Sequence, residues 1–466
     1  MNDQTVALSK SEVLELICRM FPWIAGFRHR PLGDYASTAF DVEASDNSCE
    51  IRQHAKTLLG RCVHNAARRA GFSADTSDRF RHEILEFPVL QTGPHLHLLI
   101  EPDAYYTHLF SLMGIRAHRR PAYISYAVST VKFVERGRKG PGWLRLEDNS
   151  FNVFGLTRSR MIPYSVLARN GPYRFKLMNV DRPNAVSDAG SRLMSMLPQG
   201  EFSSAATAIK QANIGLWKKF FDARVDFLQL DDDDIADLVV EHLSDNSSWL
   251  AREVISDQDF AANLLRRTEE VCAGPWGGWF KNSTDFFWGS DKGRLFPLRL
   301  AGGCLRAGEA ENYMLPYEAD ELIAALRAHR IIPNLFLMFI VTAMLPGVRV
   351  LGGSRHTIYY PLMRYVLASA LRAQGRDSSL LSALQGDFRP GVWGHRVFLR
   401  PGEPFAELEA LQGGDISALL DQCHEMPLTE ACGSLESFVS DPVWANLRTS
   451  IAQGAVSPES DEWAFS

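Results

Sequence analysis

Two histidines in a short glycine-containing segment are the strongest candidates for chemistry in this chain. His95 and His97 lie in residues 91–97, which read QTGPHLH and directly follow an apolar run. An imidazole titrates near neutral pH, so these side chains can transfer a proton or donate hydrogen bonds to phosphate oxygens. Thr92 adds a hydroxyl, and Gly93 permits close approach of a ligand to the backbone. We therefore predict an active-site loop here.

The same spacing leaves two other interpretations open. Histidines at i and i+2 can bind a metal ion, although no His-Glu-x-x-His motif accompanies them. A tight turn with two surface histidines needs no function at all. The chain also lacks a Walker loop, a Gly-x-Gly-x-x-Gly fingerprint and a Gly-x-Ser-x-Gly elbow. The usual nucleotide loops and serine hydrolase chemistry are therefore unsupported.

The elements around the loop predict a βαβ unit. Residues 84–90 are short and apolar and indicate a buried strand. Residues 105–114 indicate a helix that ends at Gly114, and residues 122–134 are rich in β-branched and aromatic side chains, which is typical of a strand. Strand, loop, helix and strand together build a parallel sheet. A loop between strand and helix directs backbone N–H groups toward a phosphate or carboxylate.

The remaining pattern is mostly helical. Helices are expected within residues 8–30, 51–70, 201–270, 318–330 and 358–374, and turns and short strands within 135–200. The acidic run 231–234 is expected at a helix N-terminus, where carboxylates are favourable, rather than at a metal. Residues 273–300 are aromatic and are expected to form a core hairpin or the floor of a ligand pocket.

Composition restricts the class of protein. The chain has 466 residues and a formal net charge of -6, so the basic footprint of a nucleic-acid-binding protein is absent. The most apolar stretch, 331–350, is interrupted by proline, glycine and arginine, which favours buried core over a membrane span. Seven cysteines without a Cys-x-x-Cys motif and no secretory signal favour a cytoplasmic location.

Three segments resemble the bacillithiol-forming cysteine ligases. The family pattern Thr-Gly-Gln-Gln-x-Gly-Leu-x-x-Gly-Pro matches at Thr92, Gly93, Leu98 and Pro102 without a gap. A second match combines Ile-Pro-Asn at 332–334 with Leu-Pro and a double glycine within 345–353, and a weaker third covers 286–295. The matches follow the family order over most of the chain.

The resemblance implies an α/β fold with a Rossmann-like, nucleotide-binding parallel sheet and inserted connecting segments, related to class I aminoacyl-tRNA synthetases. Residues 1–200 would form the N-terminal Rossmann-like half, 201–300 helical and aromatic-rich connecting segments, and 301–466 the C-terminal half that completes the core. The implied activity is ligation of an amino acid to an amine, with ATP or another adenine nucleotide as cofactor.

Roles for individual residues follow from this placement. Thr92, Gly93, Gly352, Gly353 and Tyr359 are the expected nucleotide-binding residues. His95 and His97 are expected to stabilise charge on a leaving phosphate, and His356, which replaces the family's glutamate, to act as general base.

The chain also departs from the family. The acidic cluster after the second strand is replaced by residues 125–132, His108 stands at a basic position, and the C-terminal coiled coil is missing. Two alternatives therefore remain: a metal-dependent or hydrolytic enzyme that uses His95 and His97, and a non-catalytic nucleotide-binding protein. The expected partners are small-molecule substrates, with no nucleic acid and no membrane, and the oligomeric state is undetermined.

Overall fold

A central parallel sheet organises the molecule. The computed structural model describes residues 8–42, 49–135, 137–182, 187–221, 224–279, 281–308, 313–387, 389, 391–411 and 416–464. The five sheet strands lie in the spatial order β14 (Gly391–Trp393), β13 (Arg349–Gly352), β1 (Val89–Gln91), β2 (Ala122–Tyr126) and β6 (Asp226–Leu230). Every neighbouring pair in this sheet is parallel.

The order of these strands reverses inside the sheet. From β1 the chain moves outward through β2 to β6, and then returns to place β13 on the other side of β1, with β14 beyond it. Val89 pairs with Arg349, and Gln91 pairs with both Leu351 and Ser125. Since the strands are parallel, the loops that follow β1 and β13 leave the sheet at the same edge, side by side.

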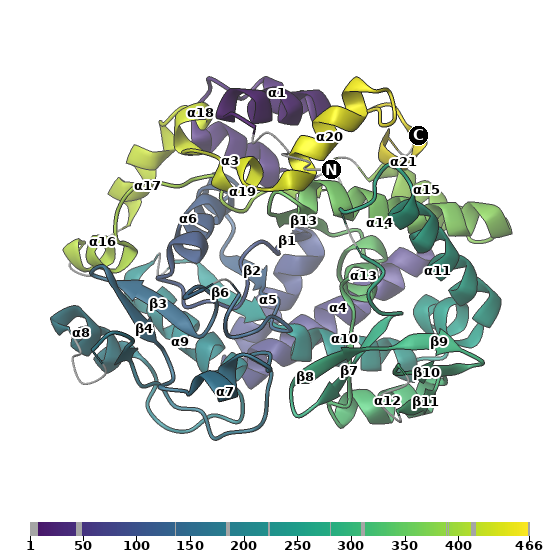
Figure 1. The fold of residues 1–466 in the computed structure, drawn as a ribbon, viewed down its shortest axis with the longest axis horizontal. Helices are drawn as coiled ribbons and strands as arrows, with labels where there is room; N and C mark the ends of the chain where they lie inside the picture. The colour runs from purple at the N-terminus through teal and green to yellow at the C-terminus, as the bar shows by residue number, and fades with distance from the viewer. Residues whose placement is uncertain are drawn as a thin grey trace, which may run out of the picture.

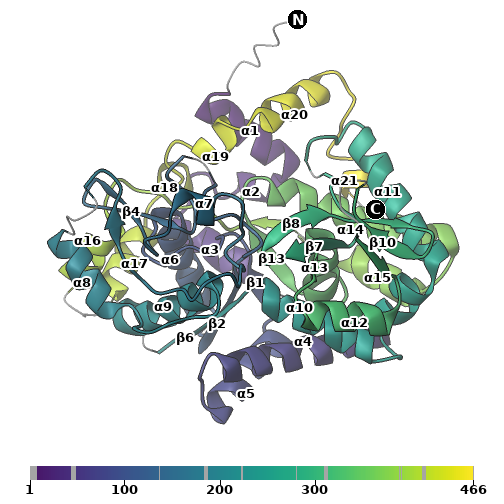
Figure 2. The same cartoon turned by 60° about the horizontal axis from the view of Figure 1, so that its bottom comes forward.

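Helices cover both faces of the sheet. Helices α6 (Pro102–Ala117) and α9 (Ala205–Phe220) lie on one side, and α4 (Glu50–Arg69), α10 (Asp232–Ser244) and α14 (His356–Gln374) lie on the other (Figures 1 and 2). All five strands are almost wholly buried, as expected for strands covered on both faces.

Short helices and small sheets surround this core. The other helical segments are α1 (Lys10–Met20), α2 (Pro22–Ala25), α3 (Leu32–Phe40), α5 (Ala74–Glu86), α7 (Arg158–Met161), α8 (Asp188–Met196), η1 (Leu250–Ser256), α11 (Gln258–Ala273), α12 (Ala319–Arg327), α13 (Leu335–Phe339), η2 (Ile340–Met344), α15 (Ser378–Gly386), α16 (Pro404–Ala410), α17 (Ser417–His424), α18 (Leu428–Ala431), α19 (Glu436–Val439), α20 (Pro442–Ala452) and α21 (Asp461–Ala464). Three antiparallel sheets contain β3 (Trp143–Leu146), β4 (Asn149–Asn152) and β5 (Met178–Asn179); β7 (Phe287–Asp291), β8 (Arg294–Pro297) and β12 (Ile331–Pro333); and β9 (Arg299–Ala301), β10 (Cys304–Arg306) and β11 (Met314–Pro316).

The predicted βαβ unit is present as β1, α6 and β2, with different boundaries. Residues 84–86 end α5, so the strand begins only at Val89. Helix α6 continues past Gly114 to Ala117. A Cβ on Gly114 would lie 2.2 Å from Cδ2 of Phe40, so this glycine lets α3 pack closely on α6 and does not end the helix. The predicted strand 122–134 ends at Tyr126.

Several other predicted elements are present, and one predicted helix is interrupted. Helices within 51–70, 318–330 and 358–374 and a hairpin within 273–300 are confirmed as α4, α12, α14 and the β7–β8 pair. The helix expected over 8–30 is interrupted at Pro22, which starts α2 because it has no N–H to continue α1.

The region 201–270 was predicted to be helical, and this is wrong for 226–230, which form β6. This segment reads DFLQL, and so short a stretch with three apolar residues cannot be distinguished from buried helix by periodicity. The central sheet therefore takes its strands from all three parts of the chain that the sequence suggested.

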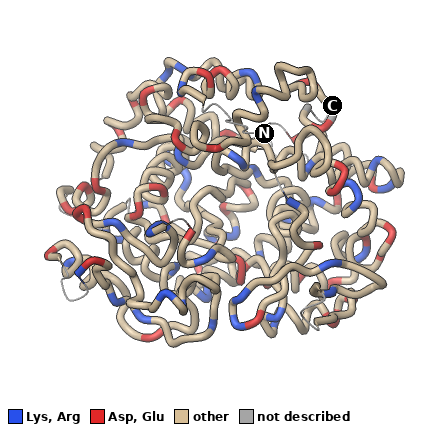
Figure 3. The backbone as a smooth tube through the Cα atoms, in the orientation of Figure 1, with Lys and Arg blue, Asp and Glu red and all other residues tan. Residues whose placement is uncertain are grey.

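The acidic run is at a helix N-terminus, as predicted. Asp231 caps α10 by accepting from the Asp234 amide, and Asp234 accepts in return from the Asp231 amide. The apolar stretch 331–350 is buried as β12, α13, η2 and the start of β13. Among the described residues, no helix is long and apolar enough to cross a membrane. Acidic and basic residues are interspersed along the backbone (Figure 3).

Candidate functional site

A cavity of about 660 Å³ lies at the carboxyl edge of the central sheet. Its walls come from the loops after β1, β2, β13 and β14, from the first turns of α6, α13 and α14, and from residues 436–442 of α19, α20 and the turn between them. It therefore lies where the strand order reverses. Of the residues predicted for the site, the cavity brings together Thr92, Gly93, His95, His97, Gly353, His356 and Tyr359.

The loop after β1 is fastened to the neighbouring strand β13. Both the amide and the hydroxyl of Thr92 donate to the Leu351 carbonyl, at 2.7 and 2.9 Å. The hydroxyl proton is thus already used, and only the lone pairs of Thr92 face a ligand. A Cβ on Gly93 would lie 2.1 Å from Cβ of His395. The side chain of His395 therefore occupies the space beside Gly93. The sequence had suggested that a ligand could approach the backbone at this glycine.

Both predicted histidines converge on a carboxylate that the sequence analysis did not identify. Glu135 Oε1 lies 2.7 Å from Nδ1 of His95 and 3.5 Å from Nε2 of His97. The two imidazole rings are nearly parallel, with an interplanar angle of 13°. His97 is buried, whereas the other two side chains are partly exposed to the cavity. Glu135 lies in an irregular loop after β2, and nothing in its neighbours along the chain marked it.

The electrostatics of this group favour an ionised carboxylate. Burial raises the pKa of Glu135, but the hydrogen bonds and charges of the two histidines outweigh it and hold the pKa far below its usual range. Burial lowers the pKa of His97, while Glu135 and the nearby Glu101 and Asp103 raise it, with a net increase. His97 Nδ1 is buried and has no hydrogen-bond partner among the described residues.

A basic wall faces the histidines. Lys139 Nζ and Arg396 Nη2 both contact Oδ2 of Asp103, so two cations share one carboxylate. Burial raises the pKa of Asp103, yet Arg396 and Lys139 bring it down to about 2. Nε of Arg396 is buried without a partner among the described residues. This wall therefore carries an excess positive charge and an unused donor.

The two glycines at the end of β13 differ in their position relative to the cavity. Gly353 lines the cavity, but Gly352 does not. A Cβ on Gly352 would lie 2.2 Å from Cγ of His356, so the imidazole of His356 occupies that space. The prediction that Gly352 contacts a nucleotide is therefore not supported by its position. Gly352 instead permits His356 to pack at the start of α14.

His356 is a neutral, buried imidazole. Only 3% of the residue is exposed, and it lies among the rings of Phe339, Tyr359 and Tyr360 at centroid distances of 5.3–5.6 Å. Neither ring nitrogen has a partner among the described residues, and burial lowers the pKa to about 3. Such an imidazole is a weak base, so it suits a hydrogen bond to a ligand better than the predicted removal of a proton.

A fourth histidine, His395, also lines the cavity. His395 follows β14, and its Nδ1 lies 2.8 Å from the Thr107 hydroxyl oxygen. Its ring contacts the positions beside Gly93 and Gly353. Burial and the charge of Arg396 lower its pKa well below the usual value. Sequence patterns did not indicate His395 because the strand before it has only three residues.

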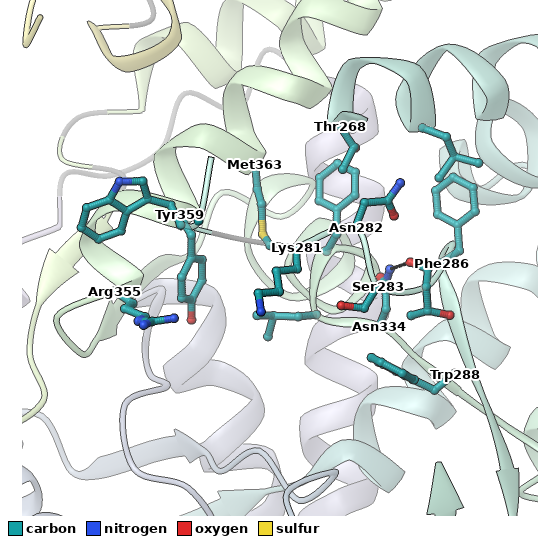
Figure 4. A pocket seen from close by; sticks show the side chains of 16 residues that line it. Thr268, Lys281, Asn282, Ser283, Phe286, Trp288, Asn334, Arg355, Tyr359 and Met363 are labelled. Carbon is teal, nitrogen blue, oxygen red and sulfur yellow. Dashed lines mark hydrogen bonds between the residues drawn. The ribbon is translucent and has the colours of Figure 1, made fainter. Parts of the chain in front are cut away.

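A smaller chamber of about 290 Å³, whose lining is drawn in Figure 4, shares lining residues with the main cavity. Leu335, Arg355 and Tyr359 line both spaces. Its other walls combine aromatic side chains with amides and hydroxyls from the region 276–288 and from α13: Trp279, Phe286, Trp288, Asn282, Ser283 and Asn334. The aromatic region is thus both a core hairpin and one wall of a pocket.

The C-terminal segment closes one side of the cavity. Arg355 makes two hydrogen bonds to Asp441, at 2.6 and 2.8 Å, and the Ser354 hydroxyl donates to the Ser437 carbonyl at 3.0 Å. The first turn of α14 is thereby held against the chain around α19 and α20.

No protein-family model matches the chain, and no curated protein compared with it is a match. The assignment of a function therefore depends on the fold and on the chemistry of this cavity.

Proposed function

We propose that the chain is an ATP-dependent carbon–nitrogen ligase of small-molecule metabolism with a Rossmann-like core. The proposal depends chiefly on the place of the cavity. Counted along the chain, the sheet strands lie in the order 3-2-1-4-5, and the cavity lies at the carboxyl edge beside strands 1 and 4. Open α/β sheets bind ligands at this reversal point.

The walls of the cavity have the chemistry to hold an anionic nucleotide. Its volume lies within the range of about 300–1,000 Å³ usual for ligand sites. The dipole of α14 favours a phosphate near its N-terminus, which lies at the cavity. The amides of residues 357–359 already donate to the carbonyls of Gly353 and Arg355, so the helix contributes its dipole rather than free donors. Lys139 and Arg396 line the same cavity, and because they share the single carboxylate of Asp103 they leave one net positive charge there. These features support ATP or another adenine nucleotide as the cofactor.

The adjoining chamber suits the second part of the reaction. Aromatic walls with a few amide and hydroxyl groups accommodate a small organic molecule that is part apolar and part polar. We propose that the amino acid or the amine binds there and reaches the main cavity past Arg355 and Tyr359. His95 and His97 would lie against the nucleotide phosphates, and buried His356 would hydrogen-bond the ligand near the junction.

Nucleotide binding is the first test. We expect ATP to raise the melting temperature of the full chain, because a ligand at 100 times its Kd adds about 2.7 kcal/mol of stability. Arg396→Gln should weaken ATP binding at least tenfold in a calorimetric titration. Arg448→Gln is the matched control, since Arg448 pairs with Glu12 outside the cavity. Equal ATP affinity in all three proteins would contradict the proposed site.

Turnover is the second test. The ligase proposal requires that AMP or ADP appears only when an amino acid and an amine are present, with a condensed product in the mass spectrum. Release of nucleotide products without condensation would instead favour a hydrolytic enzyme. ATP binding without any turnover in pools of amino acids and amines would favour a non-catalytic nucleotide-binding protein.

A further inference from the structure

His95, His97 and Glu135 form a set of donors suited to a metal ion. One ligand atom from each side chain lies within 4.8 Å of the other two. Among the described residues, no other three histidines, cysteines or carboxylates meet in this way. All three residues line the main cavity.

The distances agree with the size of a coordination sphere. Two ligands of a tetrahedral zinc ion lie about 3.3 Å apart when each is about 2.0–2.1 Å from the metal. Glu135 Oε1 lies 2.7 Å from one histidine nitrogen and 3.5 Å from the other. The two histidine nitrogens lie within 4.8 Å of each other, so they would have to approach by at most about 1.5 Å for all three atoms to surround one ion.

A hydrogen-bonded pair explains this arrangement less completely. One imidazole is enough to pair with a carboxylate, as the exposed pair of His424 and Glu425 shows. Here a second imidazole, buried and nearly parallel to the first, approaches the same carboxylate oxygen. A single divalent cation would coordinate all three donor atoms at once.

We infer that His95 Nδ1, His97 Nε2 and Glu135 Oε1 bind a divalent transition-metal ion of the zinc or ferrous-iron class. Two histidines and one carboxylate leave at least one coordination position open, as in catalytic metal sites. Because the three residues line the cavity, a ligand in the cavity can take that position. An anionic oxygen, such as that of a phosphate or carboxylate, is the group that the ion would bind.

This inference is independent of the ligase proposal. A chain that binds the metal but not ATP would keep the site and would favour the metal-dependent, hydrolytic alternative. A chain that binds ATP but no metal would keep the nucleotide proposal and remove this one. The titrations that follow are therefore made without nucleotide.

The test is a metal titration of the full chain after treatment with a chelator. We expect one equivalent of Zn²⁺ to bind in a calorimetric titration. We expect Co²⁺ to develop visible absorption that Zn²⁺ abolishes. Mg²⁺ should not compete, because two of the three donors are imidazoles. Anaerobic Fe²⁺ in place of Co²⁺ distinguishes an iron site from a zinc site by relative affinity.

Variants connect the binding to these residues. His95→Gln and Glu135→Gln should each weaken Zn²⁺ binding by more than the roughly 10–100-fold that loss of an outer-shell partner costs. His95 is 43% exposed, so we expect His95→Gln to melt like the wild type, whereas Glu135→Gln also removes the carboxylate that both imidazoles contact and should melt somewhat lower. Loss of Zn²⁺ binding in His95→Gln with an unchanged melting temperature is therefore the decisive result. His424→Gln, at the exposed histidine–glutamate pair, is the matched control. Absence of stoichiometric binding, or equal binding in all variants, would overturn the inference.

Discussion

At the scale of residues, the site depends on side chains that occupy the space beside glycines. The side chain of His395 occupies the space where a Cβ of residue 93 would lie, and the side chain of His356 does the same at residue 352. His356 is buried and His395 is half-buried, and the loss of solvent around each ring lowers its pKa, so both are neutral at physiological pH. The glycines in these loops are therefore required for packing of the site, in addition to any contact with a ligand.

This packing predicts the outcome of Gly352→Ala. The new methyl group would lie 2.2–2.6 Å from Cγ, Nδ1 and Cβ of His356, atoms too near the backbone to move freely. We expect a loss of about 1–3 kcal/mol in the free energy of unfolding by urea, the usual cost of overpacking.

A second substitution isolates the clash. In the double variant Gly352→Ala, His356→Gly, the loss caused by Gly352→Ala should largely disappear when it is measured against His356→Gly alone, because glycine also removes the Cβ of residue 356 that lies 2.6 Å from the new methyl group. Gly386→Ala is the control, because a Cβ there meets nothing within 4 Å. The same loss with or without the imidazole would show that the clash with His356 is not its cause.

The sequence indicated only the residues of the site that are close together along the chain. His95 and His97 stood out because they share one loop with a glycine and a threonine. Glu135, Asp103 and His395 did not, because each joins the cavity from a different element. A single sequence gives no measure of distances between loops that follow different strands.

At the scale of elements, the start of α10 positions the loop after β2. Asp232 is buried and accepts hydrogen bonds from the Ser129 amide at 2.9 Å, from the Thr130 amide, and from the Tyr126 hydroxyl at 2.5 Å. These contacts hold the backbone just beyond the end of β2. The same loop carries Glu135, so a helix on one face of the sheet supports a residue of the site.

We therefore expect Asp232→Asn to affect both stability and the site. An amide offers one acceptor oxygen where the carboxylate offered two, and buried donors without acceptors are costly. The expected loss in the free energy of unfolding is about 3 kcal/mol. The amides of Ser129 and Thr130 should exchange hydrogen faster, and Zn²⁺ binding should weaken although its three proposed ligands remain.

Asp237→Asn is the control for this change. Asp237 lies on the same helix but is mostly exposed, and its pairing with Arg69 at 3.2 Å is a surface contact. We expect a change below about 1 kcal/mol there. Unchanged amide protection at Ser129 and Thr130 in Asp232→Asn would refute the positioning role.

Elements were predictable where a pattern was long. Helices α4, α12 and α14 followed from spacing of apolar residues near 3.6. The strand β6 did not, because its apolar run is short and leads directly into a helix. The end of α6 was misplaced because Gly114 serves a contact with Phe40 that only the tertiary structure contains.

At the scale of the whole molecule, buried neutral histidines make stability sensitive to acid. Burial lowers the pKa of His108 to about 3, and does the same for His242. His108 packs between aromatic rings, and its Nδ1 lies 2.9 Å from the hydroxyl oxygen of Tyr123. Protonation of either imidazole therefore costs free energy in the folded chain.

The sign of the effect follows from linkage. An unfolded histidine has a pKa of about 6.5, so between roughly pH 6.5 and 3 the unfolded chain binds more protons than the folded chain. Stability should fall on acidification through this window, by up to about 1.4 kcal/mol per pH unit for each histidine. The contribution is fully present above about pH 6.5.

Urea unfolding at several pH values tests this prediction. Other titratable groups make the unfolding free energy of both proteins depend on pH. We therefore compare the slope of unfolding free energy against pH in the wild type with the slope in His108→Gln. The variant should depend less on pH between 6 and 4.5. Parallel curves of unfolding free energy against pH would show that His108 has the same pKa in the folded and unfolded states.

The parallel sheet itself was predictable, but the sources of its strands were not. Strand, loop, helix and strand around residues 89–126 follow from local sequence, so β1 and β2 could be anticipated. The pairing of Val89 with Arg349 could not, because no local pattern connects residues so far apart. The reversal of strand order, which creates the cavity, arises from that pairing.

This pairing has a consequence for synthesis of the chain on the ribosome. The Thr92 hydroxyl reaches a carbonyl that lies 259 residues later, at Leu351. Until β13 emerges, one side of β1 has no partner strand, and such an unpaired edge invites wrong association. A nascent chain that stops short of β13 should therefore aggregate or bind a chaperone more readily than one that includes β13.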